Sequence, residues 1–229
     1  MISYSRIFNF GRSASRLLCA LLFVSAAGAL QAHSVWIEPA EESLVIRFAE
    51  PGNKLETSPG FLDHLSAPLA VIAAAGKPAP LVVTKKADHF LLEGAAPENV
   101  ACVETTFTVR GGRKPYFYAR WQLTLEAEAP PLLTLDLTPT GRPGEVRAWF
   151  RGQPLPNAEA TLRSPDGEES DLTADANGYL HFDSPQKPGQ YLLTIAHHRE
   201  ALGGFHLGVA YQETSHNCSL VWRVAAAAP

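Results

Sequence analysis

The sequence predicts an all-β protein made of two small β-sandwich modules, the second a seven-stranded Greek-key sandwich. Three observations predict this fold class. After residue 32, short runs alternate apolar and polar residues, Pro and Gly interrupt these runs, and sustained helical periodicity is missing. Because successive side chains of a strand point to opposite faces, such alternation is typical of sheets with one buried face.

The first module is predicted to span residues 33–129. Its clearest strand patterns cover residues 43–48, 81–84, 103–109 and 116–121, and residues 60–65 predict one helical turn, with a loop as the alternative. An acidic, alanine-rich stretch then ends in Pro130 and Pro131. A proline pair resists both helix and central strand, so we place the module boundary there.

The second module, residues 130–229, repeats short strand patterns between turn signals. The patterns cover residues 132–137, 145–150, 158–163, 179–182, 191–196 and 218–224. These six patterns and their spacing fit a small Ig-like sandwich of about seven strands. The segment from 152 to 196 also resembles the transthyretin-like or carboxypeptidase-regulatory-like sandwich modules of secreted proteins. Fold follows from this resemblance, but function does not.

Residues 1–32 predict a secretory signal peptide. Three arginines and no acidic residue precede an apolar stretch, residues 17–30, which ends in small side chains. A membrane-spanning helix needs about 20 apolar residues, so this stretch is short for one. We expect cleavage after Ala32 and a soluble periplasmic product that begins at His33. Cleavage after Ala29, which fits the small-x-small rule better, is the alternative.

Cleavage leaves an acidic chain. It removes three of the 19 Lys and Arg residues and none of the 23 Asp and Glu residues, which gives a formal charge of −7. Nucleic acid is therefore not expected as a partner. Cys102 and Cys218 are the cysteines that remain, and in an oxidising compartment we expect them to pair. Two separate buried thiols are the alternative.

No familiar catalytic motif is present in the sequence. It contains no Gly-x-Ser-x-Gly elbow, glycine-rich phosphate loop, Cys-x-x-Cys pair or His-Glu-x-x-His pattern, so we do not expect an enzyme. Histidine is the informative residue. All eight histidines follow residue 32, and five lie near the two ends of the predicted mature chain: His33, His197, His198, His206 and His216. Neutral imidazole binds nickel, cobalt, copper and zinc.

His33 carries the sharpest metal hypothesis. As the N-terminal residue it would offer two donors, a ring nitrogen and an α-amine whose pKa of about 8 makes it available near neutrality. An ordinary histidine at the start of a strand is the alternative. Strict alternation after Tyr191 places His197 on the apolar face of its strand and His198 on the opposite face, so at most one of them should reach a given ligand.

Three stretches together resemble a known family. They are AHSVWIEP at residues 32–39, RKPYFYARW at 113–121, and the His-rich end from 191 to 224. A Gly-x-Pro-Leu-x-x-Ala pattern, residues 152–158, accompanies them. The family is a domain of unknown function described as a NikM-like periplasmic component of cobalt and nickel ABC uptake systems. The resemblance covers nearly all of the predicted mature chain.

The resemblance implies a periplasmic protein that binds nickel or cobalt and is an accessory to metal uptake, with an inner-membrane importer as a partner. His33 would supply two donors, and His197 or His198 and His216 would complete the shell, with Trp36 packing beside them. Nitrogen donors leave copper and zinc open. Two rivals remain. One is a non-metal adhesion or interaction module that binds partners along exposed sheet edges; the other is a copper oxidase.

Overall fold

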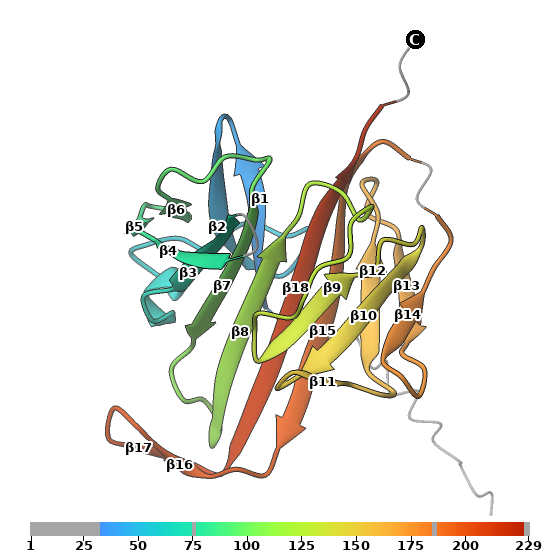
Figure 1. Ribbon diagram of the computed structural model, residues 1–229. Coiled ribbons are helices and arrows are strands. Elements are labelled where there is room, and N and C mark those ends of the chain that lie inside the picture. The colour runs from blue at the N-terminus through green and yellow to red at the C-terminus, as the bar shows by residue number, and fades with distance from the viewer. Residues whose placement is uncertain (1–32, 75–76, 185–186, 227–229) are drawn as a thin grey trace, which may run out of the picture. The chain divides into compact units, whose positions relative to one another are not determined.

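The protein is almost entirely β-structure (Figure 1). The computed structural model describes residues 33–74, 77–184 and 187–226, and the predicted signal peptide lies outside them. In the described part the only helical element is the short 3-10 helix η1 (Phe61–His64), as predicted for residues 60–65. The all-β sandwich prediction is confirmed. No helix in these described segments is long and apolar enough to span a membrane.

One eight-stranded sheet forms the centre of the fold. Its strands occur in the order β13 (Glu169–Thr173), β12 (Glu159–Arg163), β15 (Gly189–Glu200), β18 (Glu213–Val224), β8 (Arg113–Trp121), β7 (Val100–Thr106), β3 (Leu69–Ala74) and β4 (Lys77–Leu81). Neighbouring strands are antiparallel except β8 and β18, which run parallel. Because β8 comes from the first predicted module and β18 from the second, this parallel pair joins the two halves.

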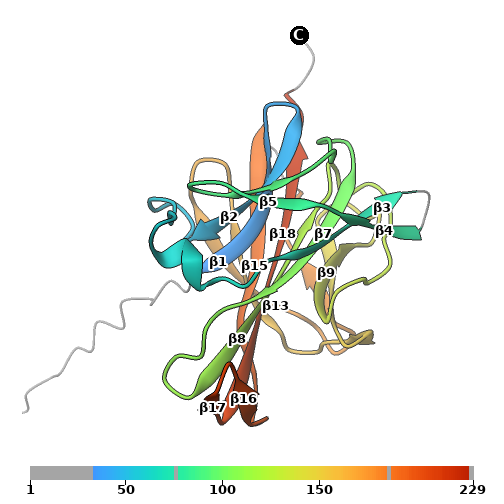
Figure 2. The same cartoon turned by 90° about the vertical axis from the view of Figure 1, so that its left-hand side faces the viewer.

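Two smaller sheets cover the central sheet. The first contains β1 (Ser34–Ala40), β2 (Ser43–Ala49), β6 (Phe90–Leu92) and β5 (Val83–Lys85). The second contains β9 (Leu135–Pro139), β10 (Glu145–Phe150), β11 (Gln153–Pro154) and β14 (Tyr179–His181). Figure 2 shows β1 and β2 crossing in front of β15 and β18, and the hydroxyl of Ser219 on β18 donates to the carbonyl of Val35 on β1 at 2.7 Å.

Alternation along the central strands explains why there are two cores. On β8, Phe117, Ala119 and Trp121 belong to the first core, whereas Tyr118 belongs to the second. On β18, Val221 faces the first core, and its neighbours Leu220 and Trp222 face the second. The central sheet is therefore apolar on both faces and lies between the two smaller sheets. The predicted boundary at residues 129/130 separates the covering sheets, while residues 31–229 form one compact unit.

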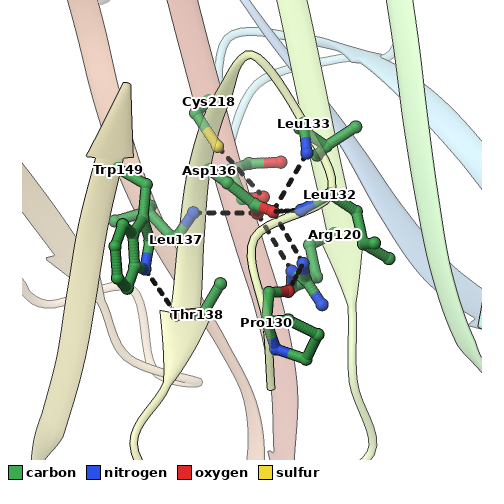
Figure 3. Close-up of polar contacts among 10 residues, drawn as sticks. Arg120, Pro130, Leu132, Leu133, Asp136, Leu137, Thr138, Trp149 and Cys218 are labelled. Carbon is green, nitrogen blue, oxygen red and sulfur yellow. Dashed lines mark hydrogen bonds and ion pairs between the residues drawn. The ribbon is translucent and has the colours of Figure 1, made fainter. Parts of the chain in front are cut away.

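A buried ion pair connects the central sheet to the second covering sheet (Figure 3). The guanidinium of Arg120 on β8 donates to both carboxylate oxygens of Asp136 on β9, at 3.0 and 2.6 Å. Arg120 also donates to the carbonyl of Pro130. The Asp136 carboxylate accepts three backbone N–H groups, those of Leu132, Leu133 and Leu137. Both side chains are at most 1% exposed, so their charges are compensated inside the protein.

The predicted disulfide is wrong, because Cys102 and Cys218 are both free and buried. Cys102 lies on β7 opposite Arg120, and Cys218 lies on β18 beside Tyr118, so β8 separates them. Two strand spacings amount to about 10 Å, which is beyond the reach of a disulfide. Burial raises the pKa of the Cys102 thiol to about 12 and that of Cys218 well above its usual value, which keeps both thiols unreactive.

We expect Arg120→Met to lower the free energy of unfolding by about 3–5 kcal/mol, because it leaves the Asp136 carboxylate buried without its cation. Urea denaturation measures the change. Arg163→Met is the matched control: it breaks the part-exposed pair with Glu169, at a cost of no more than about 1 kcal/mol. Equal losses of unfolding free energy in the two variants would show that the buried pair contributes no more to stability than the part-exposed one.

Thiol titration of the denatured, unreduced protein should find Cys102 and Cys218 both free, because the sheet register holds them on strands that are not neighbours. The protein must be purified from an oxidising compartment, because a reducing one would leave both thiols free whatever their positions. Finding no free thiol at these two positions would contradict the register of β7, β8 and β18.

Candidate functional site

Two of the predicted metal ligands meet across neighbouring strands. His198 on β15 lies directly opposite His216 on β18, with ring centroids 6.3 Å apart. His216 is 4% exposed, and His198 is half-buried. Both rings lie on the face of the sheet that carries the second core, where Phe150 of β10 packs against each of them, with centroids at 4.5 and 5.1 Å.

A β-bulge creates this pairing. Ile195 pairs with Cys218 and His198 with His216, so two residues of β15, Ala196 and His197, lie opposite the single residue Asn217. His197 takes up the extra length with φ of 60°. The side chain of Asn217 accepts the backbone N–H of His197 and donates to the carbonyl of Tyr116 on β8, so it fixes the bulge to both neighbouring strands.

The bulge reverses the predicted orientation of the two adjacent histidines. Alternation without a bulge would place His197 with Ile195 on the apolar face, but the extra residue places His198 there instead. His197 is exposed, and the charges that act on it belong to Arg199, Arg113 and Glu213. Both histidines border a surface pocket of about 240 Å³, which gives His198 access to solvent.

Both ring nitrogens of His216 have partners. The hydroxyl of Tyr118 lies 2.9 Å from Nδ1, and a carboxylate oxygen of Glu200 lies 3.1 Å from Nε2. A neutral ring satisfies both contacts when Tyr118 donates to Nδ1 and Nε2–H donates to Glu200. Tyr116 stacks on the ring, with centroids 5.2 Å apart and an interplanar angle of 11°. The imidazole is therefore held in one orientation.

Glu200 links the histidines to an exposed cation. The same carboxylate oxygen that faces His216 accepts a hydrogen bond from the guanidinium of Arg151 at 2.7 Å. Arg151 also lies over the ring of Phe150, 4.7 Å from its centroid. His198, Glu200 and His216 thus form one cluster, the histidine–carboxylate cluster, at the end of the second core.

Burial lowers the pKa of both His198 and His216. The carboxylate of Glu200 opposes this shift in each case but does not outweigh burial. The two imidazoles are therefore neutral at neutral pH, which is the form that binds metal ions.

The structure does not bring His33 or His197 into the cluster. His33 lies on the other face of the central sheet, between the rings of Phe48 and Phe61 of the first core, and its Nε2 is 2.7 Å from a carboxylate oxygen of Glu56. Trp36 packs in the first core, on the other face of the central sheet from His198 and His216, and so does not pack beside them as the resemblance implied. Within the described ranges no three His, Cys, Asp or Glu side chains are already placed to hold one metal ion.

Glu200 and Tyr118 were missed by the sequence analysis. Glu200 had a usable signal, because it lies two residues after His198 and so shares its face of the strand. Tyr118 had none, since its contact with His216 depends on the parallel pairing of β8 with β18 across 98 residues of sequence.

Comparisons with known proteins add little to this description. No family model matches the chain, and no curated protein matches it. Among solved structures, one similar chain is the crystal structure of chicken CNTN1 FN1-FN3 domains, with 10% identity over 86% of this chain and 68% of that chain. Its TM-score is 0.22, a value too low to carry an argument about function.

Proposed function

We propose that this chain is a periplasmic protein that binds a divalent transition metal ion as an accessory to nickel or cobalt uptake, with His198 and His216 as nitrogen donors and Glu200 as an oxygen donor. The observation that carries the proposal is the pair of neutral imidazoles on neighbouring strands, with a carboxylate within hydrogen-bonding distance of one of them. Metal ions bind the deprotonated forms of all three groups.

Tyr118 makes His216 a workable ligand. A phenol hydroxyl both donates and accepts. The ring of His216 can therefore change from its Nε2–H tautomer to its Nδ1–H tautomer without rotating, and still keep its hydrogen bond with Tyr118. Nε2 then offers its lone pair toward Glu200, and the ring of His198 lies 6.3 Å from that of His216 between centroids. A hydrogen-bond partner on the nitrogen that does not bind the metal is a common feature of metal sites, and Tyr118 would orient the ring of His216 in this way. Glu200 would exchange its contact with Arg151 for the metal ion.

The choice of metal comes from the family resemblance and not from the donors. Two imidazoles and a carboxylate suit nickel, cobalt, copper and zinc, and the general order of affinities favours copper where it is available. Transfer of the ion to an inner-membrane importer belongs to the same proposal.

The rival function, partner binding along exposed sheet edges, has less support. The central sheet ends in β4 on one side, where Pro78 and Pro80 cannot donate backbone hydrogen bonds to an added strand. It ends in β13 on the other side, where Glu169 and Asp171 add charge. Both devices discourage strand addition.

Calorimetric titration should show about one Ni(II) or Co(II) bound per chain, and His198→Ala should weaken binding by more than about tenfold. Even groups that only support a ligand are commonly worth about 10–100-fold in metal affinity, so loss of a ligand should cost at least as much. His198 is half-buried at the edge of the cluster, so this change leaves the cores intact.

His181→Ala is the control, since that ring is 61% exposed and lies beside Glu145, away from the cluster. It should bind metal like the parent protein. If His33→Ala abolishes binding while His198→Ala does not, the α-amine hypothesis holds and the histidine–carboxylate cluster is not the site. If the parent protein binds no metal, the proposed function is wrong.

Metal occupancy should fall as the pH drops below about 6.5, because protons then compete with the metal for the imidazoles. Burial lowers the pKa of both histidines, so release should begin below the usual imidazole value and not above it. Measuring bound metal between pH 8 and 4 separates three donor types. Release already near pH 7–8 would indicate the α-amine of His33, and retention below about pH 5 would indicate a carboxylate site, for example one built from Glu41, Asp63 and Asp88.

A further inference from the structure

An uncharged hairpin connects the two strands of the histidine–carboxylate cluster. Residues 201–212 contain no Asp, Glu, Lys or Arg and include β16 (Gly204–His206) and β17 (Val209–Tyr211). The hairpin projects past the ends of β8, β15 and β18 in both ribbon views (Figures 1 and 2). Its strands pair only with each other among the described strands.

The hairpin exposes large apolar side chains on every side. Phe205 is 80% exposed and Leu207 84%, and Leu202 and Val209 are each more than half exposed. Phe205 pairs with Ala210 and the next residue, His206, pairs with Val209, so Phe205 and Val209 point to opposite faces. Leu207 occupies the turn. A protein groove covers one face of a hairpin, whereas an apolar medium that surrounds the tip covers all of it.

The base of the hairpin is fixed to the body of the protein. The backbone N–H groups of Gln212 and Glu213 both donate to the carbonyl of Gly112, in the turn before β8. The side chain of Tyr211 is hydrogen-bonded to that of Tyr116. These hydrogen bonds fix the base of the hairpin in position. Less conformational entropy would therefore be lost when the tip inserts into an apolar medium.

Several arginines lie near the base in the chain. Four of them, Arg110, Arg113, Arg151 and Arg199, lie on the strand ends and turns near the hairpin. Glu213 pairs with Arg113 and Arg199, Glu200 pairs with Arg151, and the guanidinium of Arg110 lies over the ring of Phe61. This basic collar has a formal charge of +2, in a chain whose residues 33–229 carry −7. The charge at this end is opposite in sign to that of the chain as a whole, and an anionic surface complements it.

From the apolar tip and the basic collar together, we propose that the hairpin docks on an anionic lipid bilayer, with Phe205, Leu207 and Val209 in the interfacial region and the collar among the headgroups. Amphipathic elements with apolar and basic groups arranged in this way bind such interfaces. Because β16 and β17 pair only with each other among the described strands, we place the tip in the interfacial region, where water can reach its outer edges, and not in the hydrocarbon core. The proposal does not depend on a bound metal.

Co-sedimentation of the metal-free processed protein, which lacks the predicted signal peptide, with phosphatidylcholine–phosphatidylglycerol vesicles tests the proposal. The parent protein should bind, and more weakly at high salt. The double change Phe205→Ser and Leu207→Asn should reduce binding at least about tenfold, because it removes the two most exposed apolar side chains of the tip. Asn tolerates the positive φ of 49° at position 207.

The control is the double change Leu69→Ser and Val82→Ser, at residues that are 76% and 69% exposed outside the hairpin, and it should bind like the parent. Three results would overturn the proposal: no binding to the anionic vesicles, equal loss in the two double variants, or equal binding to pure phosphatidylcholine vesicles. Self-association that requires Phe205 and Leu207, without vesicle binding, would instead identify a second copy of this chain as the occupant.

Discussion

The buried ion pair between Arg120 and Asp136 ties the central sheet to the layer that covers the histidines. A carboxylate without exposure to water needs a cation and hydrogen-bond donors around it, and Asp136 has both from Arg120 and from three backbone N–H groups. These contacts fix β9 and the chain leading into it. β9 in turn pairs with β10, where Phe150 packs against His198 and His216. The cluster therefore depends on a charge pair that takes no part in its chemistry.

The second constraint is the bulge at Ala196 and His197. Without the extra residue, His198 would point away from His216 and Glu200 would turn with it, since side chains alternate along a strand. Asn217 stabilises the bulge by bonding the backbone of His197 and that of Tyr116 on the parallel strand. This side chain thus supports the bulge that sets the face of the histidines. The hairpin that follows Glu200 starts from the same strand ends, so the cluster and the exposed apolar tip share one end of the sheet.

Local sequence patterns predicted the strands, but not the contacts between distant strands. Strand alternation and the turn signals identified residues 116–121 and 191–196 as strands, which lie within β8 and β15. The short helical turn near Phe61 was also among the predictions. The parallel pairing of β8 with β18 was not, because it joins segments about a hundred residues apart and leaves no local pattern. His198 and His216 were among the predicted ligands. Their pairing needed the bulge, and a bulge of ordinary residues has no clear sequence signal. His33 was predicted beside them because the sequence does not show which face of the sheet a distant strand covers.

The central claim is that His198 and His216 bind the metal ion together. X-ray absorption at the nickel edge of the loaded full chain tests it most directly, because imidazole rings give a distinct scattering pattern that can be counted. The account predicts two imidazoles and an oxygen donor in the parent protein, one imidazole in His198→Ala, and two in the His181→Ala control. An identical spectrum for the parent and His198→Ala, or a coordination shell without imidazole, would contradict it.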